Sequence, residues 1–314
     1  LAIDLGERLV GKNFDSPEVM FQQLSSELEV LVLQTLEVGP IAQVIAGLDI
    51  ACWDLVARRA GKPLHQMLSD RVVSHVPVYV TGINPDQPEV FAAARQAEGF
   101  KAFKLKTGFG HDRDVRNLQA MREVLGAEAV LTCDSNQNLD LQSAVAFAQA
   151  IAPLNLSWLE EPLRVDTPEA DWQALARASS TPLAGGENFH GQQFDQALSS
   201  AILQVIQPDI TKWGGVSGNT SVAHRAVAAH KRYCPHYFGG GISLLASLHV
   251  LAAVGGEGLL EFDAHPNLGR EAVVGDLLPV KDGSVPVPTG PGLGAVPDLG
   301  KLAQYQTWSG HIHA

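Results

Sequence analysis

The sequence predicts an α/β protein whose main part is an eight-stranded (β/α) barrel. From residue 76 onward, short β-branched or apolar runs alternate with amphipathic helical stretches, which is typical of βαβ units. A length of 314 residues, 46% of them hydrophobic, suits a barrel of about 250 residues with a small accessory domain. The expected strands are Val76–Thr81, Ala102–Lys106, Ala129–Asp134, Leu156–Glu160, Pro182–Glu187, Leu203–Ile210, Tyr233–Phe238 and Leu259–Asp263.

Two helices are expected before the first strand. Asp15 or Ser16 can cap a helix that has Pro17 in its first turn, and a second helix should run from about Pro40 to Ala60, where Gly61 ends it. Between the strands we expect further helices, such as 142–152, 172–178 and 221–231. No Gly-x-Gly-x-x-Gly or Walker-type loop follows a strand, so a nucleotide-binding doubly wound sheet is the less favoured alternative.

The chain should divide into three parts. Residues 1–72 would form a helical accessory domain, residues 73–275 the barrel, and residues 276–314 a final segment. That segment is rich in Gly and Pro, as in Val285-Pro286-Val287-Pro288, and we expect it to leave the barrel and pack on the first domain.

Composition excludes several classes of protein. The formal net charge is -12 and no basic block is present, so nucleic acid is not an expected partner. Apolar stretches such as Ile242 to Val254 are too short to span a bilayer, and the first residues do not resemble a secretory signal. Cys52, Cys133 and Cys234 are odd in number and far apart, which indicates a reducing, cytoplasmic location.

Ionisable residues recur at the ends of the expected strands. They follow one another at intervals of 22 to 28 residues, close to the roughly 31 residues of an average barrel unit. Because catalytic groups in such barrels lie at the carboxyl ends of the strands, these residues should meet at one site. They are Lys106, Asp134, Glu160, Glu187, Asp209, His236 and Glu261.

Three of these residues are carboxylates on consecutive strands. Asp134, Glu160 and Glu187 should converge, and hard oxygen ligands suit Mg²⁺ or Mn²⁺. Each alone is more often an ordinary loop or capping residue. Glu161 should point away from this site and be structural, because side chains alternate along a strand.

Two lysines occupy one face of the second strand. Lys104 and Lys106 alternate with Phe103 and Leu105, which indicates one lysine face and one buried face rather than a solvated charge cluster. A lysine acts as a base near neutral pH when its pKa is lowered, and a second cation nearby has that effect.

Asp209 and His236 end neighbouring strands. A carboxylate hydrogen-bonded to histidine fixes its tautomer and raises its basicity, so this pair is a candidate acid/base. Glu261, on the last strand, can hydrogen-bond a substrate carboxylate.

These motifs resemble those of the mandelate racemase branch of the enolase superfamily. Lys104-Leu-Lys106 is similar to the Lys-x-Lys of that family, and Asp134-Ser135-Asn136 to its Asp-x-Asn. Further similar motifs are Trp158-Leu159-Glu160-Glu161-Pro162, Gly186-Glu187-Asn188, Asp209 ahead of Lys212-Trp213-Gly214-Gly215, Pro235-His236, and the helix 46–55. The resemblance implies an enolase-type (β/α)7β barrel with a helical remnant of an α+β capping domain, without the N-terminal sheet that begins family members.

The resemblance also implies a reaction. Mg²⁺ on Asp134, Glu160 and Glu187 would stabilise the ene-diolate formed when the proton α to a substrate carboxylate leaves, with Lys106 as one base and the His236–Asp209 dyad as the other. Lys104, Asn136 and Glu261 would bind the small carboxylate substrate. Dehydration of an acid sugar or related hydroxy acid to a 2-keto acid is favoured; alternatives are a racemase or epimerase of a 2-hydroxy or amino acid, and a catalytically silent metal-binding barrel. We expect a homo-oligomer.

Overall fold

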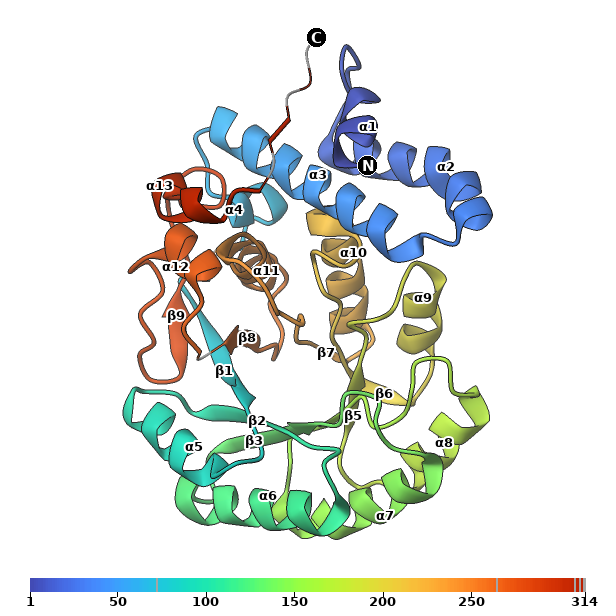
Figure 1. The fold of residues 1–314 in the computed structure, drawn as a ribbon, viewed down its shortest axis with the longest axis vertical. Helices are drawn as coiled ribbons and strands as arrows, with labels where there is room; N and C mark the ends of the chain where they lie inside the picture. Colours follow the sequence, from blue (N-terminus) through green and yellow to red (C-terminus); the bar gives the residue numbers. More distant parts are fainter. Residues whose placement is uncertain (72, 264, 308, 311, 313–314) are drawn as a thin grey trace.

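The computed structural model describes residues 1–71, 73–263, 265–307, 309–310 and 312. Figure 1 shows a layer of helices at one end of the molecule and a curled sheet surrounded by helices at the other. Residue 72, where the first predicted domain ends, and residues 313–314, which end the third, lie outside the described residues. The division into three domains stays a prediction.

The first 68 residues form the helical layer. Ser16 caps the start of the helix Pro17–Thr35. Its side chain accepts a hydrogen bond from the Val19 amide at 3.4 Å, and Pro17 occupies the first turn. A small core of Leu5, Met20, Leu24, Leu28, Ile41 and Ile45 joins the helices. Both predicted helices are confirmed; the four helices of the layer are α1 (Ala2–Glu7), α2 (Pro17–Thr35), α3 (Val38–Arg59) and α4 (Leu64–Leu68).

Helix α3 has the length and composition of a membrane-crossing segment, a property that was not predicted from the sequence. In the structure it packs on α2 and on the barrel, and its buried face includes the charged residue Asp49. Length and composition alone do not distinguish such a core helix from a membrane span.

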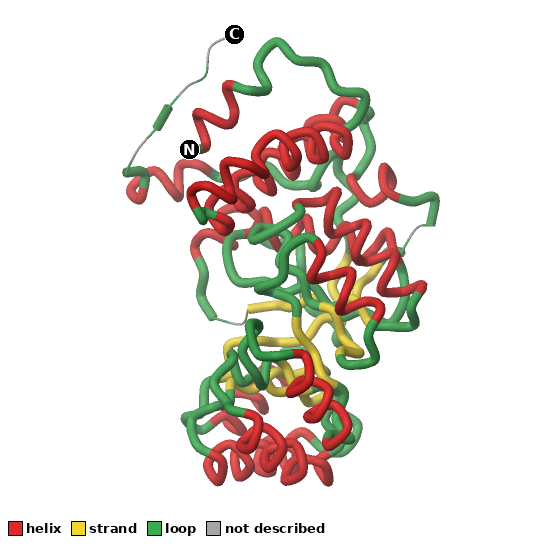
Figure 2. Tube along the Cα trace, turned by 90° about the vertical axis from the view of Figure 1, so that its right-hand side faces the viewer, coloured by secondary structure: helices red, strands yellow, loops and turns green. Residues whose placement is uncertain are grey.

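Eight parallel strands form a curled half-barrel (Figures 1 and 2). Their order along the sheet is β7-β6-β5-β4-β3-β2-β1-β8, so consecutive strands are neighbours except where β8 pairs with β1. The two end strands of this order, β7 and β8, come close together next to the hydrogen bond that the Leu259 amide donates to Cys234 Sγ at 3.4 Å. The strands are β1 (His75–Ile83), β2 (Ala102–Lys106), β3 (Val130–Asp134), β4 (Leu159–Glu160), β5 (Leu183–Gly185), β6 (Leu203–Ile206), β7 (Arg232–Tyr233) and β8 (Leu260–Asp263).

Helices cover the outer face of the sheet, as the βα pattern predicted. The main apolar core lies between sheet and helices and includes Phe103 and Leu105, the residues that alternate with the two lysines of β2. The remaining elements are α5 (Pro88–Ala97), α6 (His111–Leu125), α7 (Leu141–Ile151), η1 (Ala152–Leu154), α8 (Glu169–Ala178), α9 (Gln192–Ser199), α10 (Gly215–Ala228), α11 (Gly241–Val254), α12 (Leu268–Val274), β9 (Ser284–Pro286), α13 (Leu299–Leu302) and η2 (Ala303–Tyr305).

Several strands are shorter than the sequence predicted. The expected strand 182–187 ends at Gly185, because Gly186 has a φ of 133°. The expected strands 203–210 and 233–238 end at Ile206 and Tyr233, ahead of prolines that lack an N–H for the ladder. Glu187, Asp209 and His236 therefore lie in the loops that follow the strands, although Asp209 and His236 still form an isolated parallel bridge.

The helical layer joins the barrel through buried polar contacts. Asp49 of α3 accepts hydrogen bonds from the Ser217 amide at 3.0 Å and hydroxyl at 2.6 Å, in the first turn of α10. The indole of Trp53 donates to the same hydroxyl at 2.9 Å. Gly215 lies so close that a Cβ there would be 2.4 Å from a carboxylate oxygen of Asp49, which explains a glycine at this point.

The final segment returns toward the helical layer. Strand β9 pairs antiparallel with β1, a pairing that was not predicted from the sequence. Farther on, the Gly292 carbonyl accepts a hydrogen bond from the Leu64 amide at 2.8 Å, and Asp54 accepts one from the Leu293 amide at 2.7 Å.

Candidate active site

A cavity of about 720 Å³ opens at the carboxyl ends of the barrel strands. This is the end at which (β/α) barrels carry their catalytic groups. Five of the predicted site residues line it: Lys106, Asn136, Glu187, His236 and Glu261. The other lining residues are Thr81, Gly82, Asn84, Lys212, Tyr237, Phe238, Gly239, Asp263, His265, Pro266 and Asn267.

Lys104 lies below the cavity, with its side chain 0% exposed. Its ammonium group is 2.7 Å from Glu160 Oε1, 2.8 Å from Glu261 Oε1 and 5.3 Å from the centre of the Tyr79 ring. Burial lowers the pKa of Lys104, but the charges of Glu160 and Glu261 outweigh burial and hold this pKa well above its usual range. Lys104 therefore holds two carboxylates in place as a cation, and it does not line the cavity.

Lys106 lies two residues farther along the same face of β2. Its ammonium group is 2.5 Å from Asp134 Oδ2, and the other oxygen of Asp134 accepts a hydrogen bond from the Asn136 amide at 2.8 Å. The common direction of the two lysines was predicted from the alternation along β2, and their contacts agree with it.

Glu160 is almost completely buried beside Asp134, its register partner on β3. Its Oε2 accepts hydrogen bonds from the indole of Trp158 at 3.0 Å and from the amide of Gln207 at 2.7 Å. Trp158 was quoted in a sequence motif but assigned no role, and Gln207 was not singled out from the sequence. Trp158 precedes Glu160 by two residues, so strand alternation would have placed both on one face.

His236 is held between two carboxylates. Its Nδ1 is 2.8 Å from Asp209 Oδ2, and its Nε2 is 2.7 Å from Glu187 Oε2. Thr211 fixes Asp209, because its amide and hydroxyl both donate to Oδ1 at 2.7 Å. The structure thus brings the predicted dyad together and adds Glu187 on the opposite side of the imidazole.

The charges of this group shift its pKa values. Burial lowers the pKa of His236, but Glu261, Asp209 and Glu187 outweigh burial and raise this pKa to about 10. Burial raises the pKa of Asp209 and of Glu187, yet the hydrogen bonds and charge of His236 hold both below their usual range. In this arrangement the imidazole carries a proton on each nitrogen.

Glu261 contacts both Lys104 and the loop that carries His236. One of its oxygens contacts Lys104, and the other accepts a hydrogen bond from the Tyr237 amide at 2.9 Å. Tyr237 directly follows His236, so the last strand helps to position the loop that carries the histidine.

A second layer of polar residues supports Glu187. The amide of Asn188 donates to Glu161 at 2.9 Å and to Glu187 at 3.0 Å, and Lys212 is 3.1 Å from Glu187. Gln137 donates to the other oxygen of Glu161 at 3.2 Å. Glu161 does not line the cavity, and its carboxylate lies beside Glu187 through their shared partner Asn188; its structural role stays a prediction. Lys212 was quoted in the sequence motif but assigned no role, and the structure places it on the cavity wall.

The three predicted metal ligands do not form a metal-binding cluster in the structure. Across the described residues, no three His, Cys, Asp or Glu side chains lie close enough together to hold a metal ion. Asp134 and Glu160 are instead paired with lysines, and Glu187 with Lys212 and His236. Their role as ligands stays a prediction.

The donor chemistry of the site fits a divalent cation. Six carboxylates face only three ammonium groups and one imidazole, so the site has an excess of negative charge. Hard oxygen ligands on adjacent strands are those that Mg²⁺ prefers. The carboxylates are Asp134, Glu160, Glu161, Glu187, Asp209 and Glu261, and the cations Lys104, Lys106, Lys212 and His236.

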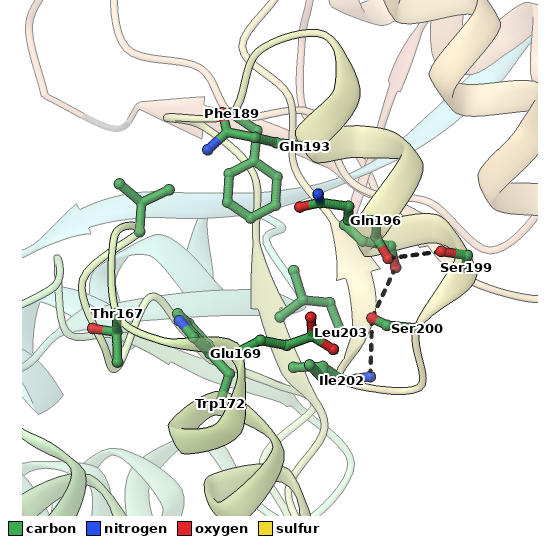
Figure 3. A pocket seen from close by; sticks show the side chains of 12 residues that line it. Thr167, Glu169, Trp172, Phe189, Gln193, Gln196, Ser199, Ser200, Ile202 and Leu203 are labelled. Carbon is green, nitrogen blue, oxygen red and sulfur yellow. Dashed lines mark hydrogen bonds between the residues drawn. The ribbon is translucent and has the colours of Figure 1, made fainter.

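A second cavity, of about 480 Å³, lies between α8 and α9. Figure 3 shows Trp172 and Phe189 beside amide and hydroxyl side chains, among them Gln193 and Gln196. None of the predicted site residues lines this cavity, so the chemistry is concentrated in the first one.

Known proteins share this fold. Residues 89–301 match a family model described as enolase C-terminal domain-like. A crystal structure of a mandelate racemase/muconate lactonizing enzyme from Bordetella bronchiseptica RB50 is 48% identical, with a TM-score of 0.91 over 96% of this chain and 84% of that chain. The chain belongs to the mandelate racemase/muconate lactonizing enzyme family of the enolase superfamily. The resemblance predicted from the motifs and the barrel fold are both confirmed.

Relatives in this family act on sugar acids and their lactones or anhydrides. D-Galactarolactone cycloisomerase of Agrobacterium fabrum is 34% identical over 83% of this chain and 73% of its own length. Arabinonate dehydratase of Saccharolobus solfataricus is 28% identical over 83% of this chain and 72% of its own length. Family members bind magnesium, as in the structure of a racemase from Streptomyces coelicolor A3(2), 29% identical with a TM-score of 0.80 over 96% of this chain and 81% of that chain.

Proposed function

We propose that this protein is an acid-sugar dehydratase, which abstracts the proton α to a carboxylate and eliminates the β-hydroxyl to give a 2-keto acid. The observation that carries this proposal is the position of His236. Its Nδ1 is engaged by Asp209, and its Nε2 pairs with Glu187 at 2.7 Å beside the cavity that Lys106 also lines, so Nε2 is the nitrogen that would deliver a proton once Glu187 binds the metal. The dehydratases among the relatives support the choice.

The metal in this proposal is Mg²⁺, with Mn²⁺ as the alternative, on Asp134, Glu160 and Glu187. When bound, the cation supplies positive charge that stabilises the substrate carboxylate as it gains electron density. Lys104 holds Glu160 and Glu261 in position from below. Asn136 and Glu261 lie on the cavity wall, where Asn136 can donate a hydrogen bond to the carboxylate of a small substrate and Glu261 can accept one from a substrate hydroxyl.

Two proton transfers complete the elimination. Lys106 would act as the base after its ammonium group has lost a proton: its amine takes the α-proton, and the electron pair of that C–H bond forms a double bond between the α- and β-carbons. The β C–O bond breaks, and the Nε2 proton of His236 goes to the departing hydroxyl, which leaves as water. The resulting enol gains a proton at the β-carbon and loses the proton of its hydroxyl to solvent, which gives the 2-keto acid with no net change in protons.

Cycloisomerisation is a second candidate. Two relatives that are 34% identical are named as cycloisomerases of a galactarolactone and of an anhydrogalactonate. In such substrates a ring oxygen can take the place of the hydroxyl as the leaving group. The same two proton transfers would then open the ring without releasing water.

The remaining alternatives make different products. A racemase or epimerase would return a proton to the opposite face of the α-carbon, so the β-hydroxyl would be retained. A catalytically silent metal-binding barrel would bind Mg²⁺ and change no substrate. A cytoplasmic location and a homo-oligomeric state stay predictions from the sequence.

A substrate screen tests the proposal. The protein with Mg²⁺ is incubated with a library of sugar acids, lactones and anhydro acids, and 2-keto acid formation is measured with product mass. Loss of one water is expected, together with loss of turnover in His236→Asn but not in His224→Asn, which changes an exposed histidine of α10. Ring opening with unchanged mass would establish the cycloisomerase instead. Inverted substrate would establish the racemase, and metal binding without any product the silent barrel.

A further inference from the structure

The side of the cavity formed by β1 and β8 carries polar groups that the proposed reaction does not use. Thr81 and Asp263 are register partners on these strands, two residues beyond Tyr79 and Glu261. Asn84 and His265 extend this side into the following loops. Side chains two residues apart on a strand share a face, so Asp263 lies above Glu261 on the cavity wall.

We infer that this side of the cavity binds the uncharged, hydroxylated end of the substrate, and that the protein selects sugar acids with one carboxylate over those with two. The inference rests on the proposed action on sugar acids. It distinguishes aldonates from aldarates, which differ only at the carbon farthest from the reacting carboxylate.

Asp263 brings a negative charge to this side, and its carboxylate forms no ion pair with a basic side chain among the described residues. Its side chain is 8% exposed, and Oδ1 accepts a hydrogen bond from the His265 amide at 3.0 Å. Arg270 is near, but its guanidinium donates to the backbone carbonyls of Asp263 and His265. A carboxylate with free lone pairs accepts hydrogen bonds from hydroxyls and repels a second carboxylate.

His265 adds a second acceptor. Its Nε2 is 2.7 Å from the carbonyl oxygen of Gly82, which can only accept, so Nε2 carries the proton. In the neutral ring, Nδ1 is then left with a lone pair for a hydroxyl. The ring is fixed by stacking on Phe91, with centroids 5.3 Å apart. Gly82 permits its approach, since a Cβ there would be 2.7 Å from the ring.

The cations that line the cavity come from other elements than β1 and β8. Lys106, Lys212 and His236 come from β2 and from the loops after β6 and β7, and each is already paired with a carboxylate. A second carboxylate on the substrate would therefore meet Asp263 with no compensating charge. Burying such a group is costly, whereas a hydroxymethyl group can donate to Asp263 or His265.

Ligand-detected NMR can test this selectivity, because it reports binding and turnover in one sample. Matched pairs such as D-galactonate with D-galactarate and D-gluconate with D-glucarate are compared on the whole protein with Mg²⁺. We expect the aldonate of a pair to bind on the order of tenfold tighter. Asp263→Asn keeps the hydrogen bond to the His265 amide, and it should reduce this ratio by a similar factor through tighter aldarate binding. Asp276→Asn makes the same charge change on an exposed residue and should leave the ratio unchanged.

Each outcome has one meaning. Aldarates that bind as tightly as aldonates, or a ratio that Asp263→Asn does not change, would overturn the inference. So would the absence of binding by any acid sugar, which would also remove the basis of the proposed function. Selective aldonate binding without product would support the subsite and count against dehydration.

Discussion

Replacing His249 with asparagine should reduce the acid sensitivity of the folded state. His249 of α11 and His65 of α4 are both buried, 0% and 2% exposed, and their rings stack with centroids 5.2 Å apart. The two Nδ1 atoms are 3.1 Å apart, and the His65 amide also approaches His249 Nδ1 at 3.3 Å. Because that amide can only donate, His249 Nδ1 must be the acceptor of both contacts, and a proton there would face two donors.

The magnitude follows from the pKa of His249. Burial lowers this pKa from 6.5 to about 4, and the neighbouring His65 acts in the same direction. One pKa unit corresponds to about 1.4 kcal/mol, so the lowering of the His249 pKa corresponds to roughly 3 kcal/mol of unfolding free energy. The unfolded histidine gains a proton below pH 6.5 while the folded one does not. The contribution is therefore complete above pH 6.5 and is lost as the pH falls toward 4.

Urea unfolding between pH 4.5 and 8 measures the effect. The protein is kept in a chelator, so that metal binding adds no pH dependence of its own. In His249→Asn the new amide oxygen can still accept a hydrogen bond from the His65 amide. The smaller side chain should lower the unfolding free energy at every pH. The further decrease of this free energy on acidification should be smaller than in the wild type. His224→Asn, on the surface of α10, is the matched control. Parallel pH profiles for the wild type and His249→Asn would refute the reasoning.

Three further predictions concern the catalytic groups. Glu187→Gln should weaken Mg²⁺ binding about tenfold or more and abolish turnover while the circular dichroism spectrum is retained; unchanged affinity in a metal titration would remove Glu187 from the ligand set. Lys106→Ala should lose turnover, whereas His236→Asn can still exchange the α-proton that Lys106 reaches, which NMR in D₂O detects; full activity in Lys106→Ala would contradict its role as base. Asp209→Asn should slow loss of a β-hydroxyl by orders of magnitude but that of β-fluoride much less, since fluoride needs less proton donation; equal losses on both substrates in a kinetic assay would favour the racemase.

Local patterns in the sequence were sufficient for much of the fold and the site. Strand β2 was predicted at its observed bounds, because Phe103 and Leu105 alternate with two lysines. The dyad followed from the spacing of Asp209 and His236, since parallel strands bring their carboxyl ends together. Strand ends were less accurate, because a short apolar run gives no sign of where ladder hydrogen bonds stop.

Contacts between distant parts of the chain could not be predicted in this way. His65 and His249 are 184 residues apart, and each alone has the pattern of an ordinary helix residue. The burial of Lys104 was also missed, because its partners Glu160 and Glu261 satisfy its charge only after the barrel has curled. The sequence identified which groups meet at the carboxyl end of the barrel, but not how deeply each lies.

Because Asp49 contacts the first turn of α10, the exchange of one amide hydrogen depends on whether the helical layer is docked on the barrel. The Ser217 N–H points at a side chain of α3, not at a carbonyl of its own helix, so its protection from exchange with solvent depends on the docking of the helical layer. If the layer separates from the barrel without general unfolding, deuterium should enter at Ser217 sooner than in the later turns of α10. The lifetime of this single N–H in D₂O therefore measures how firmly the two parts are held together.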